Sequence, residues 1–213
     1  MATVDEEAQQ RIWWQRALAV LVAPTPVFAA LREDEDASME ARQEPVLALM
    51  LLAGIAGVLN TSVAGRLLDD PTYTGLLVAV WAFIGGLFYG VAVYWLGGAA
   101  LYIAGQVLGS LGSYRRARHV LGFAAAPVAL SLLLLWPVRI AVLGGDLFRS
   151  GGSDSGTTGA VFSWLCLSPF VWTLALLVVG VRAVHGWTWG RAAATTALAS
   201  AIPALLVAAS VAR

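Results

Sequence analysis

Four basic side chains stand directly before an apolar run in the stretch GSYRRARHVLGFAAAPVAL, residues 112–130. They are Arg115, Arg116, Arg118 and His119, and they could bind nucleic acid, serve acid–base chemistry, or hold a helix end at a membrane surface. Nucleic acid is disfavoured because the formal net charge is zero, so the 13 basic residues, all arginine, create no overall positive field. We therefore expect no nucleic-acid partner, and the positions of the arginines matter more than their number.

Acid–base or metal chemistry would require partners for the histidines. The chain has two, His119 and His185, and neither has a carboxylate or thiol at ligand spacing. The single cysteine, Cys166, lies in an apolar run, which excludes a cysteine-based metal site. The sequence thus predicts no catalytic residue, no cofactor and no metal, and a protein that is not an enzyme. A membrane enzyme that uses both histidines stays an alternative.

The composition is that of an integral membrane protein. Hydrophobic residues make up 59% of the chain and charged residues 12%, and the mean hydropathy is +0.77, whereas soluble domains carry roughly a quarter charged residues. A bilayer core about 30 Å thick needs about 20 apolar helical residues. Ranges 45–64, 119–143, 160–181 and 192–212 meet this need, and range 76–109 would reach about 50 Å as one helix. We predict an all-α fold, a polytopic membrane helix bundle of five transmembrane helices in which 76–109 is one long or broken span.

The arginines orient these five spans. With a cytoplasmic N-terminus, nine arginines lie on the cytoplasmic side and four outside; the nine are Arg11, Arg16, Arg32, Arg42, Arg115, Arg116, Arg118, Arg182 and Arg191, and the four are Arg66, Arg139, Arg149 and Arg213. This asymmetry obeys the positive-inside rule. Splitting 76–109 into two spans would move Arg115, Arg116 and Arg118 outside, so the arginine count favours a single span, although two spans stay possible on sequence grounds.

Six basic side chains are expected at the cytoplasmic lipid headgroups. They are Arg115, Arg116, Arg118, His119, Arg182 and Arg191, which could contact anionic lipids. Ser113 can cap the helix that carries the first four, and Pro127 should kink it. On the external side, Arg139 lies about one turn from its span's end and is expected to snorkel to the headgroups. The loop at 144–159, GGDLFRSGGSDSGTTG, is expected to be flexible and without identifiable chemistry.

Residues 1–44 form a predicted cytoplasmic segment ahead of the bundle of residues 45–213. The first residues lack the features of a secretory signal, so we expect this segment to be retained. Trp13, Trp14 and Phe28 lie on the apolar sides of two short helices, which predicts N-terminal interfacial amphipathic helices. Whether these helices rest on lipid or against the bundle stays open.

Two glycine pairs have the four-residue spacing that lets helix backbones approach closely. They are Gly86 with Gly90 and Gly105 with Gly109. We predict that these residues mediate helix packing, either inside one bundle or between copies of the chain.

Three stretches resemble the Yip domain family of Ypt/Rab-interacting membrane proteins and its bacterial relatives. They are APTPVFAALRE before an acidic segment and the first span, GSYRRARHVLGFAAAPVALSLLL at the third-span start, and VVGVRAVHGWTWGRAAATTALASAIP across the last interhelical turn. The likeness runs from about residue 11 to the C-terminus. It implies a five-span bundle with a cytoplasmic N-terminus and an external C-terminus, in agreement with the arginine count.

The resemblance also implies a function in membrane organisation. Eukaryotic relatives act in vesicle traffic, bind small GTPases and associate with one another, but their DLYGP motif is absent here, so we do not extend GTPase binding to this chain. The alanine-rich, lysine-free composition suggests a bacterial protein of the inner (cytoplasmic) membrane. We predict a non-enzymatic organising or partner-binding protein that contacts the lipid bilayer, including anionic lipids, and a homo-oligomer or membrane-protein partner. The alternative is a transporter or channel subunit for a small solute.

Overall fold

The computed structural model describes the backbone of residues 15–33, 43–110 and 112–211 and the side chains as far as residue 201. These residues form helices joined by short turns, with no strand among them. After the helical residues 15–22 come α2 (Pro24–Glu33), α4 (Gln43–Leu59), η1 (Ala64–Asp69), α5 (Gly75–Ala92), η2 (Val93–Gly97), α6 (Gly98–Val107), α7 (Tyr114–Ala124), α8 (Ala126–Leu143), η3 (Gly145–Phe148), η4 (Ser153–Ser155), α9 (Thr157–His185) and α10 (Trp189–Val211). The predicted all-α class is confirmed.

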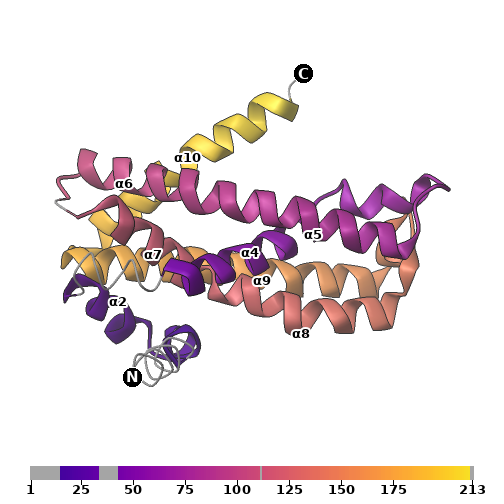
Figure 1. Cartoon of the computed structure of the whole chain (residues 1–213), viewed down its shortest axis with the longest axis horizontal. Coiled ribbons are helices and arrows are strands. Elements are labelled where there is room, and N and C mark those ends of the chain that lie inside the picture. Colours follow the sequence, from indigo (N-terminus) through magenta and orange to yellow (C-terminus); the bar gives the residue numbers. More distant parts are fainter. Residues whose placement is uncertain (1–14, 34–42, 111, 212–213) are drawn as a thin grey trace, which may run out of the picture.

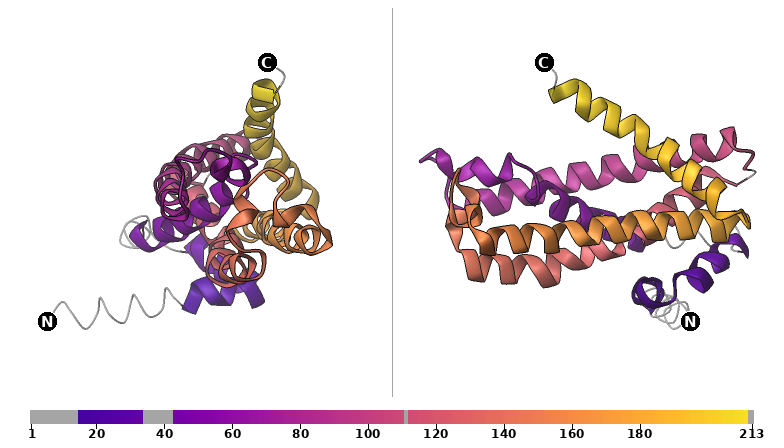
Figure 2. Two further views of the ribbon diagram at one scale, coloured as in Figure 1. Left: turned by 90° about the vertical axis from the view of Figure 1, so that its right-hand side faces the viewer. Right: turned by 180° about the vertical axis from the view of Figure 1, so that it is seen from behind.

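Three helices are long and apolar enough to cross a membrane within the ranges that the structure describes. They are Gly75–Val107, Tyr114–Leu143 and Thr157–His185, and a shorter apolar helix covers Glu44–Leu59. The long helices run side by side, while α10 leaves them at an angle toward the C-terminus (Figures 1 and 2). The five-span count therefore stays a prediction, since it also requires α4 and α10 to cross.

Most of the range 76–109 lies in one continuous helix of 33 residues, Gly75–Val107, which agrees with one long span. The helix passes from α5 to α6 through a π-helical turn at Val93–Gly97. Such turns insert one extra residue and change which side chains face the neighbouring helices. Here the π turn directs Tyr94 into the core, where its side chain is fully buried.

The first apolar helix ends earlier than predicted, at Leu59 instead of residue 64. Two polar side chains at this point bond to backbone carbonyls of the preceding turn. The Asn60 side-chain amide donates to the Ala56 carbonyl at 2.8 Å, and the Thr61 hydroxyl donates to the Val58 carbonyl at 2.7 Å. Because these groups compete with backbone amides for the same acceptors, the helix stops and the chain turns into η1.

The helix that begins with the arginine cluster starts and breaks where the sequence indicated. The Arg116 amide donates to the Ser113 hydroxyl at 3.2 Å, so Ser113 is the N-cap of α7. The helix is interrupted at Ala125, and Pro127 stands in the first turn of α8. Proline lacks an amide proton, so it is tolerated best in a first turn.

Two glycines let α4 and α5 approach closely. A methyl group added at Gly86 would overlap the backbone of Ile55, and one at Gly90 would lie 2.5 Å from the Met50 carbonyl oxygen. Gly54 of α4 is the matching residue, because a methyl group there would overlap the Gly86 carbonyl and lie 2.6 Å from the Gly90 amide nitrogen. The pair Gly86 and Gly90 thus lies inside one bundle, at the α4–α5 interface.

The helix α2 packs on the bundle through Phe28. This side chain is 0% exposed, and its ring lies beside Gly180 of α9, where an added methyl group would come within 3.0 Å of it. Leu31 on the same face is also buried. Of the two arrangements left open for this segment, the structure has Phe28 against the bundle, whereas Trp13 and Trp14 lie outside the described residues.

The loop between α8 and α9 is folded by its own polar side chains. Ser153 donates to the Leu143 carbonyl at 2.6 Å and Ser155 to the Gly152 carbonyl at 2.7 Å, which fixes η4 beside the end of α8. The Ser150 amide and hydroxyl donate to the Asp69 carboxylate at 2.8 and 2.5 Å, which ties the loop to η1. These contacts give the loop local structure, and the flexibility expected at 144–159 stays a prediction.

The Asp69 contact predicts a specific acid titration. Hydrogen bonds from the Ser150 hydroxyl and then its amide lower the pKa of Asp69 below its ordinary 3.8, because they stabilise the carboxylate. Because the pKa of Asp69 is lower in the folded protein than its ordinary 3.8, this contact stabilises the loop above pH 3.8. The stabilisation is lost as the pH falls through the pKa that Asp69 has in the folded protein.

Ser150→Ala is expected to raise the Asp69 pKa, measured by carbon NMR of the carboxyl groups in nanodiscs. Asp70 is the internal control, since its lowered pKa arises from the Thr72 amide and hydroxyl. An Asp69 pKa that is the same in Ser150→Ala and in the wild type would contradict this assignment.

Candidate functional site

Three helix ends carry arginines to one end of the bundle. We call this the arginine-rich end and define it by Arg115, Arg116, Arg118, Arg182 and Arg191. The start of α7, the end of α9 and the start of α10 meet there, on the side opposite the α8–α9 loop (Figure 1). The sequence predicted that these side chains, with His119, would contact headgroups, and the structure divides them into buried and outer groups.

Arg118 is buried in a cluster of aromatic rings. Its side chain is 5% exposed, and its guanidinium carbon lies 4.0 Å from the Trp95 ring centroid, 4.7 Å from Tyr114 and 5.1 Å from Tyr94. The π turn of the long helix supplies two of these three rings. A guanidinium over an aromatic face is stabilised by the ring quadrupole, more strongly when water is excluded. Arg118 therefore joins α7 to the η2 turn and is not exposed to headgroups, which differs from the prediction.

Two further arginines of this end lie over tryptophans of the α9–α10 turn. The guanidinium carbon of Arg182 lies 4.4 Å from the Trp189 ring, and that of Arg191 lies 4.0 Å from the Trp187 ring. Arg191 also donates through Nε to the Leu108 carbonyl at 2.8 Å, and through Nη2 to the same oxygen. A cation at the last carbonyls of a helix complements its dipole, so Arg191 holds the end of α6 against α10.

The second glycine pair lies at this contact and does not pack helix against helix. A methyl group added at Gly105 would have only Ser110 within 4 Å, with Ser110 Cβ at 3.4 Å. Ser110 belongs to the turn that follows α6. Gly109 lies beyond the end of α6 with φ +82°, and a methyl group there would approach Arg191 Nη2 to 2.7 Å. Glycine is required at this position by the left-handed turn and by the arginine beside it. Four-residue spacing alone did not distinguish this role from helix packing.

A serine and a histidine form a hydrogen-bonded pair at the same end of the bundle. Ser110 Oγ and His185 Nε2 are 2.7 Å apart, and His185 Nδ1 lies 2.9 Å from the Val181 carbonyl oxygen. Since that carbonyl can only accept, Nδ1 carries the proton and Nε2 accepts from the serine hydroxyl. The Gly112 amide donates to Ser110 Oγ at 2.9 Å. Nothing in the sequence indicated this pair, whose members are 75 residues apart.

The surroundings of this pair suit a structural role. The adjoining cavity has a volume of about 20 Å³, enough for one water molecule. Small-molecule sites are typically about 300 to 1,000 Å³. The Trp187 ring also stacks on His185, with centroids 4.4 Å apart. The pair therefore connects the α6–α7 turn to the end of α9.

His119 has different surroundings from His185. It is 0% exposed on the inner face of α7, between the buried residues Arg118 and Val120. The prediction that His119 faces the headgroups therefore differs from the structure. In the part of the chain that the structure describes, no three His, Cys, Asp or Glu residues are grouped so that they could hold a metal ion.

The outer face of the arginine-rich end is formed by the first turn of α7. Arg115 and Arg116 are half-buried there, and both belong to the turn capped by Ser113. Together with Arg182 and Arg191 they come from three helices. This group of cations, two of which lie over Trp187 and Trp189, is the candidate functional site.

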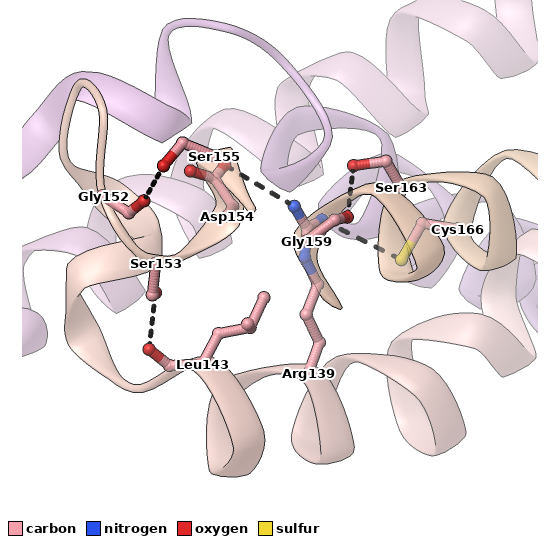
Figure 3. Close-up of polar contacts among 9 residues, drawn as sticks. All are labelled: Arg139, Leu143, Gly152, Ser153, Asp154, Ser155, Gly159, Ser163 and Cys166. Atoms are coloured by element: carbon pink, nitrogen blue, oxygen red, sulfur yellow. Dashed lines mark hydrogen bonds and ion pairs between the residues drawn. The ribbon is translucent and has the colours of Figure 1, made fainter. Parts of the chain in front are cut away.

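At the opposite end, Arg139 does not snorkel outward. Its side chain is 7% exposed and extends from α8 toward the start of α9, between Asp154 and Cys166 (Figure 3). The guanidinium Nη2 lies 4.0 Å from Asp154 Oδ2. The α8–α9 loop thus places a partly exposed carboxylate beside the buried Arg139, a contact that the sequence did not indicate.

Comparison with known proteins identifies the family. A family model described as the Yip1 domain matches residues 18–211, which is nearly the whole chain. No curated protein and no solved structure matches it. The matched range includes the arginine-rich end and every long apolar helix described above. The chain therefore belongs to the Yip1 domain family and is a multi-pass membrane protein.

Proposed function

We propose that this protein is a non-enzymatic organiser of the bacterial cytoplasmic membrane that binds anionic lipid through its arginine-rich end. The observation that carries this proposal is that Arg115, Arg116, Arg182 and Arg191 come from three helices to one end of the bundle, where Arg182 and Arg191 lie over two tryptophans. Tryptophan is enriched at the headgroup level of membranes, and arginines there attract anionic lipid. Lipid bound at fixed positions would in turn position partner membrane proteins or further copies of the chain.

The proposed topology has five spans, a cytoplasmic N-terminus and an external C-terminus. The distribution of arginines between the two ends supports it. Arg32, Arg182 and Arg191 lie at the arginine-rich end, since Arg32 Nη1 is near Gly186, whereas Arg66 and Arg149 lie in η1 and beside η3. This asymmetry obeys the positive-inside rule if the arginine-rich end is cytoplasmic.

Transport has less support, because most of the hydroxyls that could form a polar path bond to their own helices, although the buried Thr173 hydroxyl has no partner among the described residues. Ser131 donates to the Val128 carbonyl at 2.7 Å, Thr195 to Arg191 at 2.9 Å and Thr196 to Ala192 at 3.1 Å. Such hydroxyls are satisfied locally and need no water. A cavity of about 160 Å³ between α4, α5, α8 and α9 is lined almost entirely by apolar side chains. We therefore do not propose transport.

The lipid-binding proposal is tested by counting bound lipid. The wild type and the double variant Arg115→Gln/Arg116→Gln are reconstituted in nanodiscs of mixed phosphatidylglycerol and phosphatidylethanolamine, and native mass spectrometry measures the phosphatidylglycerol retained. Each arginine near a membrane surface contributes about 1 kcal/mol of attraction, so removing both should weaken phosphatidylglycerol binding about thirtyfold.

Arg66→Gln is the matched control, since Arg66 is exposed at the other end of the bundle. It should retain the wild-type amount of phosphatidylglycerol. Equal retention by the wild type and the double variant would reject the assignment of lipid binding to this end.

A further inference from the structure

A cavity of about 440 Å³ lies at the end of the bundle opposite the arginine-rich end. The end of α4, the turn before η1, α8, the α8–α9 loop and the start of α9 surround it, and its polar lining includes Asn60, Thr61, Ser62, Arg139, Asp154 and Ser163. This volume falls within the range of about 300 to 1,000 Å³ found for small-molecule sites. We call it the Arg139 cavity.

The guanidinium of Arg139 has no strong acceptor there. Asp154 Oδ2 lies 4.0 Å from Nη2, beyond the range of about 2.7 to 3.2 Å of a hydrogen bond. The second contact runs from Nη1 to the Cys166 sulfur at 3.9 Å, and a thiol is a weak acceptor. Nε has no hydrogen-bond partner among the described residues. A side chain with five N–H donors is thus buried with one distant carboxylate and one thiol beside it (Figure 3).

Arg139 is the principal donor available to a ligand in this cavity. The Thr61 hydroxyl donates to the Val58 carbonyl, and the Ser163 hydroxyl donates to the Gly159 carbonyl at 2.9 Å. The Trp136 ring lies 4.8 Å from the guanidinium carbon and stabilises the cation without accepting a conventional hydrogen bond. An ionised side chain buried without a close counter-charge is costly, and the cost is removed when an anion binds to it.

We propose that the Arg139 cavity binds an oxyanion, of the phosphate type, carried either by a small soluble molecule or by a lipid headgroup. The planar fork of a guanidinium matches two oxygens of such a group and can bind both at once. The α8–α9 loop contributes Asp154 to the lining of the cavity, and the Asp154 side chain is 32% exposed. Asp154 is the competing anion: it lies at the rim of the cavity, attracts the guanidinium from a distance, and opposes a second negative charge.

This assignment predicts opposite effects for the two charged residues. Arg139→Gln removes the charge-assisted hydrogen bonds and should weaken oxyanion binding about tenfold or more. Asp154→Asn removes the competing carboxylate and should strengthen binding. An ion pair with a purely structural role would instead lose stability in both variants and gain affinity in neither.

The experiment uses the full chain in nanodiscs and measures the midpoint of thermal unfolding. In one arm the bilayer is phosphatidylcholine and inorganic phosphate is titrated against chloride at equal ionic strength. In the other arm, phosphatidylglycerol replaces part of the phosphatidylcholine and no phosphate is added. A wild-type midpoint that rises with phosphate identifies a soluble ligand, and one that rises only with phosphatidylglycerol identifies a headgroup. In the phosphate arm, Arg139→Gln should abolish the rise. In the phosphatidylglycerol arm the comparison is made in the Arg115→Gln/Arg116→Gln background, so that lipid at the arginine-rich end does not contribute, and adding Arg139→Gln should abolish the rise that is left.

Arg149→Gln is the matched control, because Arg149 lies in the same loop region but is exposed and pairs with Asp146 at 3.4 Å. Its response should equal that of the wild type.

If Arg139→Gln does not fold, Arg139→Lys and Asp154→Asn decide the question, with weaker binding expected in the first and tighter binding in the second. No wild-type response in either arm, an unchanged response in Arg139→Gln, or no gain in Asp154→Asn would overturn the assignment. Failure here leaves the arginine-rich end untouched, since that end is tested with different variants.

Discussion

Gly86→Ala is expected to destabilise the protein, whereas Gly85→Ala, one residue earlier, is expected to be tolerated. A methyl group at Gly86 would overlap the backbone of Ile55 in α4, and backbone atoms cannot move aside as a side chain can. At Gly85 the nearest atom would be Val58 Cγ1 at 3.7 Å, an ordinary van der Waals contact. Overpacking of this kind typically costs about 1 to 3 kcal/mol of unfolding free energy.

The measurement is the midpoint of thermal unfolding for both variants in the same nanodiscs. Alanine has a higher helix propensity than glycine, so Gly85→Ala should leave the unfolding midpoint unchanged or raise it slightly. Gly86→Ala should lower the midpoint. Equal effects would contradict the close α4–α5 contact. A Gly86→Ala variant of normal stability but altered oligomeric state would instead favour the other predicted role of this glycine, association between copies.

Phe28→Ala is expected to cause the largest loss of stability among single truncations of α2. Its ring is fully buried beside Gly180 and Val120, so removal leaves a cavity between α2, α7 and α9. Truncation of a buried phenylalanine costs about 3 to 5 kcal/mol of unfolding free energy. The expected result is a fall in the unfolding midpoint of the whole bundle, measured by circular dichroism in detergent.

Val22→Ala is the control for this prediction, since Val22 is 88% exposed in the same N-terminal region and should tolerate truncation. The pair of variants also decides between the two arrangements that the sequence left open. If Phe28 rested on lipid, its loss would weaken attachment of the N-terminal segment to the membrane and leave the unfolding midpoint of the bundle unchanged.

Helix positions and their ends were largely predictable from local sequence. Ser113 caps α7 because its hydroxyl reaches an amide three residues away, and Pro127 stands in the first turn after a break because proline has no amide proton. The error at Leu59 has the same local origin: Asn60 and Thr61 bond back to the preceding turn, and a hydropathy window does not register this competition.

The surroundings of the functional side chains were not predictable in this way. Arg118 and Arg139 both stand near the ends of apolar helices, where an arginine is expected to reach the headgroups, yet both are buried. Arg118 has aromatic rings from a π turn of another helix around it, and Arg139 faces a loop carboxylate. A hydropathy profile shows how far an arginine lies from the end of its apolar helix. It does not show which residues of other helices or loops surround the guanidinium.

By itself the sequence determined the class of this protein, its long apolar helices, their caps and breaks, and the arginine asymmetry between the two ends. It did so because these features depend on side-chain chemistry within one or two helical turns. The tertiary structure alone decided that Phe28 enters the core, that Ser110 meets His185, and that Arg139 lacks a close acceptor in its cavity. Each of these depends on contacts between residues far apart in the chain, and many packings of the same apolar helices satisfy the same local pattern.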